Sequence, residues 1–244
     1  MIAIDQLHVS YPKAENPAVD GLSLHVEKGE IYGLLGPNGA GKTSTIKVIC
    51  GLQKVTGGQV TVFGKSINSS RNEALSSIGL APQEIALYPS LTAFENLRFI
   101  GEQYKVERHE LALRIDKLLE RFELKDKAGE QVQNYSGGMK RRLNLIASLL
   151  HDPSILILDE PTTGVDVQSR AIIHEYLKEE NEKGLTVVYT SHHLDEAEKL
   201  CQRVGIIDHG KMLAEGTPEQ LLSNYSCSDL ESVFISLTGR KSRD

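Results

Sequence analysis

The segment GPNGAGKT, residues 36–43, constrains the fold most, because it gathers three glycines, a lysine and a hydroxyl in eight positions. The apolar run IYGLL precedes it, and STIKVI follows it with apolar residues at helical spacing. A strand, a glycine-rich loop and a helix in immediate succession form the setting that a phosphate-binding loop requires. The sequence therefore predicts an α/β fold in which this loop joins a buried strand to a helix.

The residues of this loop suit a nucleotide phosphate better than a flexible turn. Glycines let successive backbone N–H groups curve around an anion, and the start of the helix adds partial positive charge. Lys42 is expected to reach the β- and γ-phosphates, and the Thr43 hydroxyl to bind Mg²⁺. The G-x-G-x-x-G spacing of a dinucleotide-binding loop is absent. The predicted nucleotide-phosphate-binding residues of the loop are Gly36, Pro37, Asn38, Gly39, Ala40, Gly41, Lys42, Thr43 and Ser44.

The remaining segments alternate between strand and helix patterns, which predicts a mainly parallel sheet covered on both faces. An antiparallel β part is expected at the N-terminus, where apolar residues alternate over 2–9 and 22–26. Further strands are expected over 31–35, 58–64, 78–82, 154–160 and 185–191, with a hairpin over 203–216. Helices are expected after residue 43 and over 137–150, 167–183 and 194–201.

Residues 84–134 differ from the rest, because they carry helical spacing without an intervening strand pattern. An apolar stripe typical of a core-facing helix is formed by Leu111, Ile115, Leu118, Leu119 and Phe122. We therefore expect a helical subdomain, 84–134, inserted into an α/β core of 1–83 and 135–222. Residues 223–244 are expected to be a C-terminal tail.

The segment ILILDE places two carboxylates at the end of a buried strand. Ligands bind at the carboxyl ends of parallel strands, so both side chains are expected near the phosphate loop. Asp159 would lie behind the Mg²⁺ ion, and Glu160 would polarise the attacking water. An apolar run ending in carboxylates is weak evidence alone, and it becomes informative in combination with the loop.

The segment YSGGMKRR, residues 135–142, predicts a second helix start that can bind an anion. Ser136 is a favourable N-cap, and Gly137 and Gly138 leave their N–H groups accessible. An ordinary helix cap is the alternative. The basic residues at 140–142 are expected to form a solvated helix face instead of a nucleic-acid patch.

Together, these motifs resemble those of nucleotide-binding subunits of the ATP-binding cassette (ABC) family, from Tyr11 to about Leu222. GPNGAGKT is similar to the Walker A motif of that family, and ILILDE to its Walker B motif. YSGGM resembles the family signature LSGGQ, from which Tyr135 and Met139 depart. The resemblance implies a P-loop NTPase core and one ABC ATP-binding domain over 1–244.

The resemblance also implies roles for residues outside these motifs. Tyr11 matches the aromatic residue that stacks on adenine, with an ordinary strand tyrosine as the alternative. Asp166 matches the D-loop, and His192 matches the switch histidine at the γ-phosphate, with His193 as the alternative. Implied catalytic residues are Glu160, His192 and Gln83. Implied Mg²⁺ ligands are Thr43, Gln83 and Asp159, and implied contacts to ATP of the opposite subunit are Ser136, Gly137 and Gly138.

The resemblance further implies two kinds of partner. In the family, two subunits clasp two nucleotides head to tail, so a homodimer or a heterodimer is expected. The longest apolar stretches, ILIL and LIASLL, are far shorter than the roughly 18 residues of a membrane span. A separate integral membrane permease is therefore expected, with this chain at the cytoplasmic face of the membrane. The segments around the motifs are most similar to subunits of ABC-2-type exporters.

Two other classes of function are weaker. The net charge of −6 argues against nucleic acid as a partner, because phosphate-backbone binding usually requires a basic excess. A soluble ABC-family ATPase acting on nucleic acid or ribosomes usually carries a second cassette, a coiled coil or zinc-binding cysteines. A P-loop kinase would leave YSGGM and TSHH without a function. The cargo is not indicated, because the permease selects it.

Overall fold

Two β-sheets organise the computed structural model, which describes residues 1–12 and 14–239. The larger sheet consists, in spatial order, of β10 (Lys211–Gly216), β9 (Arg203–Asp208), β3 (Ile31–Leu35), β8 (Thr186–Ser191), β7 (Ile155–Asp159) and β6 (Ile78–Ala81). Its neighbouring strands are parallel except for the β9–β10 hairpin. The smaller, antiparallel sheet consists of β2 (Val19–Val26), β1 (Ile2–Val9), β4 (Gly57–Val62) and β5 (Lys65–Ser66).

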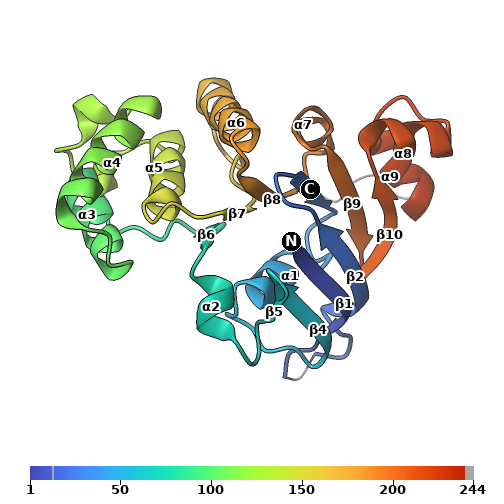
Figure 1. The fold of residues 1–244 in the computed structure, drawn as a ribbon. Helices are drawn as coiled ribbons and strands as arrows, with labels where there is room; N and C mark the ends of the chain where they lie inside the picture. Colours follow the sequence, from blue (N-terminus) through green and yellow to red (C-terminus); the bar gives the residue numbers. More distant parts are fainter. Residues whose placement is uncertain (13, 240–244) are drawn as a thin grey trace.

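The central strands of the larger sheet are buried along their whole length, as their continuous apolar sequences require. In β7, Leu156 and Leu158 belong to one hydrophobic core, whereas Ile155 and Ile157 belong to the other. The first core includes helices α5 (Gly137–Leu149), α6 (Val167–Glu182) and α7 (Leu194–Leu200). The second includes α1 (Lys42–Ile49) and the smaller sheet (Figure 1). The predicted cover on both faces is confirmed.

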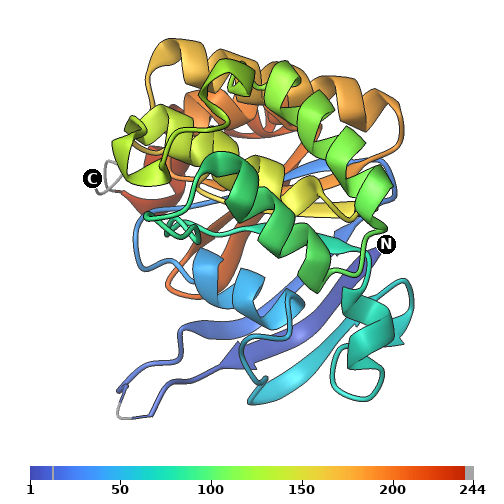
Figure 2. The same cartoon turned by 90° about the vertical axis from the view of Figure 1, so that its left-hand side faces the viewer.

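The helical insert lies beyond the β6 edge of the larger sheet (Figures 1 and 2). Short helix α2 (Arg71–Leu75) precedes β6, and the insert contains α3 (Ala93–Gln103), α4 (Arg108–Arg121), and the 3₁₀ turns Lys125–Lys127 and Val132–Asn134. Thr92 and Glu95 form a capping box at the start of α3, and Glu107 caps α4. The buried side of α4 carries the predicted apolar stripe, so the inserted helical subdomain is confirmed.

The C-terminal segment differs from the expected tail. Helix α8 (Pro218–Tyr225) crosses the predicted boundary at residue 222, and α9 (Leu230–Thr238) packs against α7 and α8. Leu230, Val233 and Phe234 are buried in the first core, so residues 223–239 belong to the folded core. Residues 240–244 of the expected tail lie outside the described residues. No helix in the described part of the chain is long and apolar enough to cross a membrane.

The strand order brings distant segments of sequence to one edge of the larger sheet. Strand β8 lies between β3 and β7, with Leu35 opposite Ser191 and Asp159 opposite Thr190. Because these strands are parallel, the loops that follow their carboxyl ends meet at the same edge. The glycine-rich loop, the two carboxylates and the paired histidines therefore lie together.

Candidate functional site

The glycine-rich loop closes tightly between β3 and α1. Gly41 has a φ of 106°, and a Cβ atom there would lie 2.5 Å from the carbonyl oxygen of Ala18. A Cβ atom at Gly36 would lie 2.2 Å from the carbonyl oxygen of Ile207, so only glycine fits either position. No side chain caps α1, and its first turn contains no acidic residue. Its backbone N–H groups and positive helix end therefore favour an anionic ligand.

Lys42 supplies a buried cation to this loop. Its side chain is 5% exposed, and its ammonium group donates to the carbonyl oxygens of Gly36 (2.7 Å) and Pro37 (3.1 Å). Nζ also lies 3.4 Å from Oε1 of Glu160. Burial lowers the pKa of Lys42 below its usual value, although the charge of Glu160 and that of Asp159 oppose this shift. Both carboxylates therefore help to keep the lysine charged.

A cavity of about 260 Å³ opens in front of the loop. Besides the loop itself, Ala18, Gln83 and Glu160 line it, so it presents backbone N–H groups, a cation, an amide and a carboxylate. Its volume is slightly below the usual range of about 300–1,000 Å³ for small-molecule sites, and polar groups line it. Such a lining suits phosphate groups.

Asp159 and Glu160 are buried where β7 ends, with 3% and 5% exposure. The hydroxyl of Thr190 on the neighbouring strand donates to Oδ1 of Asp159 (2.8 Å) and accepts from the backbone N–H of Glu160 (3.0 Å). Glu160 has a φ of 51°, a conformation that costs a non-glycine residue about 1–3 kcal/mol. The hydrogen bond from its N–H to Thr190 helps to hold this strained turn, which directs the carboxylate toward the loop.

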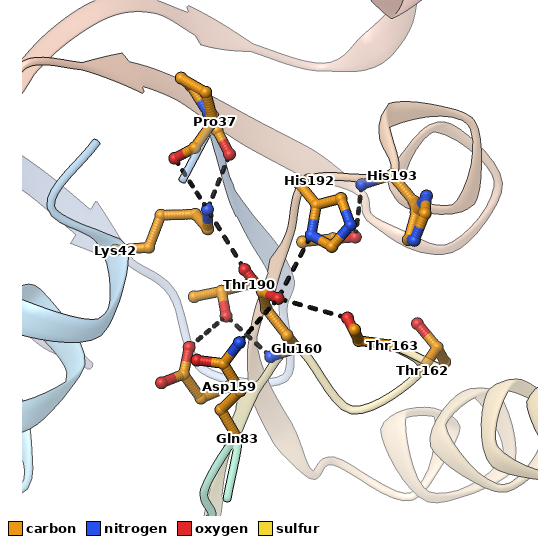
Figure 3. A network of polar contacts seen from close by, with 12 residues as sticks. Pro37, Lys42, Gln83, Asp159, Glu160, Thr162, Thr163, Thr190, His192 and His193 are labelled. Carbon is orange, nitrogen blue, oxygen red and sulfur yellow. Dashed lines mark hydrogen bonds and ion pairs between the residues drawn. The ribbon is translucent and has the colours of Figure 1, made fainter. Parts of the chain in front are cut away.

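Three side chains converge on Oε2 of Glu160 (Figure 3). Nε2 of Gln83 donates to it at 3.1 Å, the Thr163 hydroxyl donates to it at 3.2 Å, and Nδ1 of His192 lies 3.2 Å away. The His193 ring lies farther from Glu160, and its backbone N–H donates to the Ser191 hydroxyl at 2.8 Å. The geometry thus favours His192 over His193 as the histidine of this site.

The second glycine-rich helix start lies elsewhere, at the beginning of α5. The Ser136 hydroxyl accepts from the N–H of Met139 at 3.2 Å and caps the helix. Gly138 packs closely on the next helix, since a Cβ atom there would lie 2.4 Å from Oγ of Ser169 and 2.6 Å from Oδ2 of Asp166. Asp166 itself caps α6. In the described part of the chain, Ser136, Gly137 and Gly138 are not among the residues that line the cavity in front of the phosphate loop.

Tyr11 lies beside the phosphate loop. Its hydroxyl is 3.2 Å from the Ser44 hydroxyl, and the residue is 37% exposed. The ring is therefore accessible next to the position where a bound phosphate chain would begin.

Comparison with known proteins agrees with this geometry. A family model described as ABC transporter matches residues 19–163. The chain belongs to the ABC transporter family. Among its relatives is the linearmycin resistance ATP-binding protein LnrL of Bacillus subtilis (strain 168), 48% identical over 97% of this chain and 75% of that protein. The Nod factor export ATP-binding protein I of Paraburkholderia xenovorans (strain LB400) is 40% identical over 96% of this chain and 76% of that protein.

Solved structures of ABC proteins share the fold. An ATP-binding subunit of an ABC transporter is 27% identical, with a TM-score of 0.88 over 98% of this chain and 99% of that one. A dimeric ATP-binding cassette in a post-hydrolysis state bound to ADP and Pi is also 27% identical, with a TM-score of 0.81 over 89% of this chain and 98% of that one. This ABC subunit is therefore an ATP-binding protein and an ATPase.

Two of the three basic residues after the signature, Arg141 and Arg142, bind the protein backbone, so the expectation of a solvated face is wrong for these two. Arg141 donates to the backbone carbonyls of Pro82 (3.4 Å) and Gln83, and burial lowers its pKa. Arg142, whose side chain is 11% exposed, donates to the carbonyl oxygen of Phe122 at 2.7 Å. Pro82 and Gln83 directly follow β6, and Phe122 is the C-cap of α4, so both arginines bind backbone carbonyls just beyond the ends of these elements. The ABC signature helix is thus tied to Gln83 and to the insert.

Two polar residues of the ABC site were not singled out from the sequence. Thr190 was only part of the strand LTVVYTS, although a threonine near the carboxyl end of an apolar strand was an available signal. Thr163 follows Glu160 by three residues, and only the turn after β7 brings its hydroxyl back to the carboxylate. Both depend on spatial neighbours that spacing alone does not reveal.

Proposed function

We propose that this ABC subunit hydrolyses Mg²⁺-bound ATP to energise an integral membrane exporter. The observation that carries the proposal is the convergence of Lys42 and His192 on Glu160, whose carboxylate lines the cavity of the phosphate loop together with Lys42. The loop binds the β- and γ-phosphates through its N–H groups and Lys42. The exposed Tyr11 ring beside Ser44 supports stacking on the adenine.

The side chains near the loop fit Mg²⁺. Thr43, Gln83 and Asp159 offer hydroxyl, amide and carboxylate oxygens, which are the donors that Mg²⁺ prefers. In the described part of the chain, no group of three or more His, Cys, Asp or Glu side chains could hold a metal ion. Phosphate oxygens of the nucleotide and water molecules would complete the coordination. When bound, Mg²⁺ neutralises phosphate charge and orients the phosphates.

Glu160 is the proposed general base. Its Oε2 would accept a proton from the attacking water, and Gln83, Thr163 and His192 hold this oxygen in place. Nζ of Lys42 lies 3.4 Å from the other oxygen, Oε1, so the proposed base is next to the cation of the phosphate loop. Arg141 positions Gln83 through its backbone.

The start of α5 is the proposed contact to a second nucleotide. Ser136, Gly137 and Gly138 would bind the ATP held by the phosphate loop of another subunit, with Asp166 beside them. Such an arrangement requires a dimer, either of this chain or with a similar subunit. The dimeric ABC cassette that shares this fold supports it.

The exporter assignment is supported by the relatives, two of which are named for linearmycin resistance and Nod factor export. A soluble ABC-family ATPase acting on nucleic acid or ribosomes is therefore not favoured.

A permease would place this chain at the cytoplasmic face of the membrane. Residues 84–134 form the insert that we propose docks to the permease. Exposed Tyr88 and Phe99 contact each other edge to face on this insert, at 5.4 Å between ring centroids, and offer an apolar surface.

Co-purification with a membrane protein followed by an ATPase assay of the complex tests this proposal. Phe99→Glu should lower permease-stimulated ATPase activity more than basal activity, because a charge is placed on the proposed docking surface. Leu113→Glu is the matched control, since Leu113 is an exposed apolar residue of α4 outside that aromatic pair. Equal loss of stimulated and basal activity in Phe99→Glu would contradict docking at this surface.

A further inference from the structure

Glu196 on α7 is a buried carboxylate that the proposed reaction does not use. It is 3% exposed, although acidic residues are rarely buried unless they are paired. Its Oε2 accepts from the Thr162 hydroxyl at 2.6 Å and from the Tyr189 hydroxyl at 2.9 Å. A charged group with this many buried contacts holds its neighbours in fixed positions.

These contacts link the two chain segments that carry Glu160 and His192. Thr162 follows Glu160 by two residues, and α7, which carries Glu196, begins directly after His192 and His193. Glu160 in turn lies 3.2 Å from His192. Two contacts therefore constrain the distance between Glu160 and His192. One is their direct contact, and the other is the hydrogen bond between Thr162 and Glu196, which lie near them in the chain.

A third segment joins the same carboxylate from α6. Arg170 Nη1 lies 3.0 Å from Oε1 of Glu196, and Nε2 of His174 lies 3.6 Å from Oε2. Asp166 caps the start of α6 and packs on Gly138 of the signature. Glu196 thus connects the loop after β7, the switch-histidine loop and the helix that follows the D-loop.

We propose that Glu196 is a positioning residue that holds His192 against Glu160 during ATP hydrolysis. The inference rests on the roles proposed for those two residues. Burial by itself would raise the pKa of Glu196, but the nearby His174 side chain, the hydrogen bonds from Thr162 and Tyr189 and the charge of Arg170 lower it to about 2. The carboxylate stays ionised at neutral pH, so the positioning is constant and not a pH switch.

Glu196→Gln tests the proposal, because it keeps the size of the side chain and removes the charge that faces Arg170 and His174. We expect kcat to fall between about 10- and 100-fold, as small misplacements of catalytic groups do. The KM for ATP should stay within about two-fold, since the phosphate loop is untouched. Glu30→Gln is the matched control. Glu30 is also buried and lies 3.4 Å from Arg203, but it precedes β3 and therefore lies at the amino ends of the parallel strands, away from the site. It should lower Tm without lowering kcat.

A double-mutant comparison shows whether Glu196 acts through His192. If it does, His192→Ala with Glu196→Gln is about as slow as His192→Ala alone. A wild-type kcat in Glu196→Gln, or effects that multiply in the double variant, would overturn the proposal. If His192→Ala alone keeps the wild-type rate, the proposed role of His192 fails instead. Should Glu196→Gln not fold, Tyr189→Phe removes one hydroxyl from the same carboxylate and is measured in the same way.

Discussion

Helix α1 directly follows Gly41, and helix α5 begins with Gly137 and Gly138. Both helix starts offer backbone N–H groups to an anion, yet their surroundings differ. The start of α1 has no side-chain cap and lies in a cavity with a buried lysine and carboxylate. The start of α5 is capped by the Ser136 hydroxyl, and Ser136 and Gly137 are exposed. The first can hold phosphate within one chain, whereas the second carries no neighbouring catalytic carboxylate and suits a nucleotide brought by another subunit. We therefore propose that the first motif serves ATP binding and hydrolysis, and that the second serves assembly of the dimer.

The largest effect is expected for the chemistry at α1. Glu160→Gln should lower kcat by about 10²–10⁴-fold, because a general base is lost. ATP affinity should remain within about two-fold, since the phosphate loop is intact. Steady-state hydrolysis and isothermal titration measure the two quantities. Turnover near the wild-type rate would refute the role of Glu160.

The next prediction separates ATP binding from ATP hydrolysis at the start of α1. Lys42→Ala should weaken ATP binding by about 10- to 100-fold, because a hydrogen bond between charged groups contributes about 1.5–3 kcal/mol. Lys47→Ala is the control, as Lys47 is an exposed lysine of the same helix. Unchanged ATP affinity of Lys42→Ala in isothermal titration would show that the start of α1 is not the phosphate site.

The start of α5 should affect assembly alone. In the Glu160→Gln background, sizing chromatography with ATP and Mg²⁺ should show a dimer. Adding Ser136→Arg should weaken that dimer by about 30-fold or more, the effect of one central interface residue, and give a monomer. Monomer ATP affinity should not change. Ser69→Arg, at an exposed serine before α2, should leave the dimer intact. A dimer that survives Ser136→Arg would remove the distinction between the two helix starts.

The smallest effect concerns stability without nucleotide. Ser136→Ala removes the cap of α5 and should lower the free energy of unfolding by about 1 kcal/mol. Ser44→Ala in the first turn of α1 should change it by less than about 0.5 kcal/mol, because no side chain caps that helix. Urea unfolding followed by circular dichroism measures both. Equal losses would mean that the two starts are stabilised alike.

The sequence predicts the features that depend on residues close together in the chain. The phosphate loop, the strand ending in Asp159 and the cap at Ser136 each follow from a short run of residues, and the structure places these elements as expected. Thr190, Arg141 and Glu196 depend on pairing between segments far apart in the chain, which one sequence does not show.

The C-terminal helix was missed for a different reason. Leu230, Val233 and Phe234 have helical spacing, but the run is only nine residues long and carries no motif. Short helices are marginal by themselves, so its stability comes from packing on α7. The periodicity of one short segment does not show that α7 offers a surface for it to pack on.

The place of Tyr11 beside Ser44 has an optical consequence. The chain contains no tryptophan, so its intrinsic emission comes from tyrosine alone. Tyr11→Trp would put a single indole at the rim of the phosphate loop, where stacking on a base changes its surroundings directly. Ultraviolet excitation at the long-wavelength edge of the indole absorption, where tyrosine absorbs little, would then follow nucleotide arrival and departure in real time without a label.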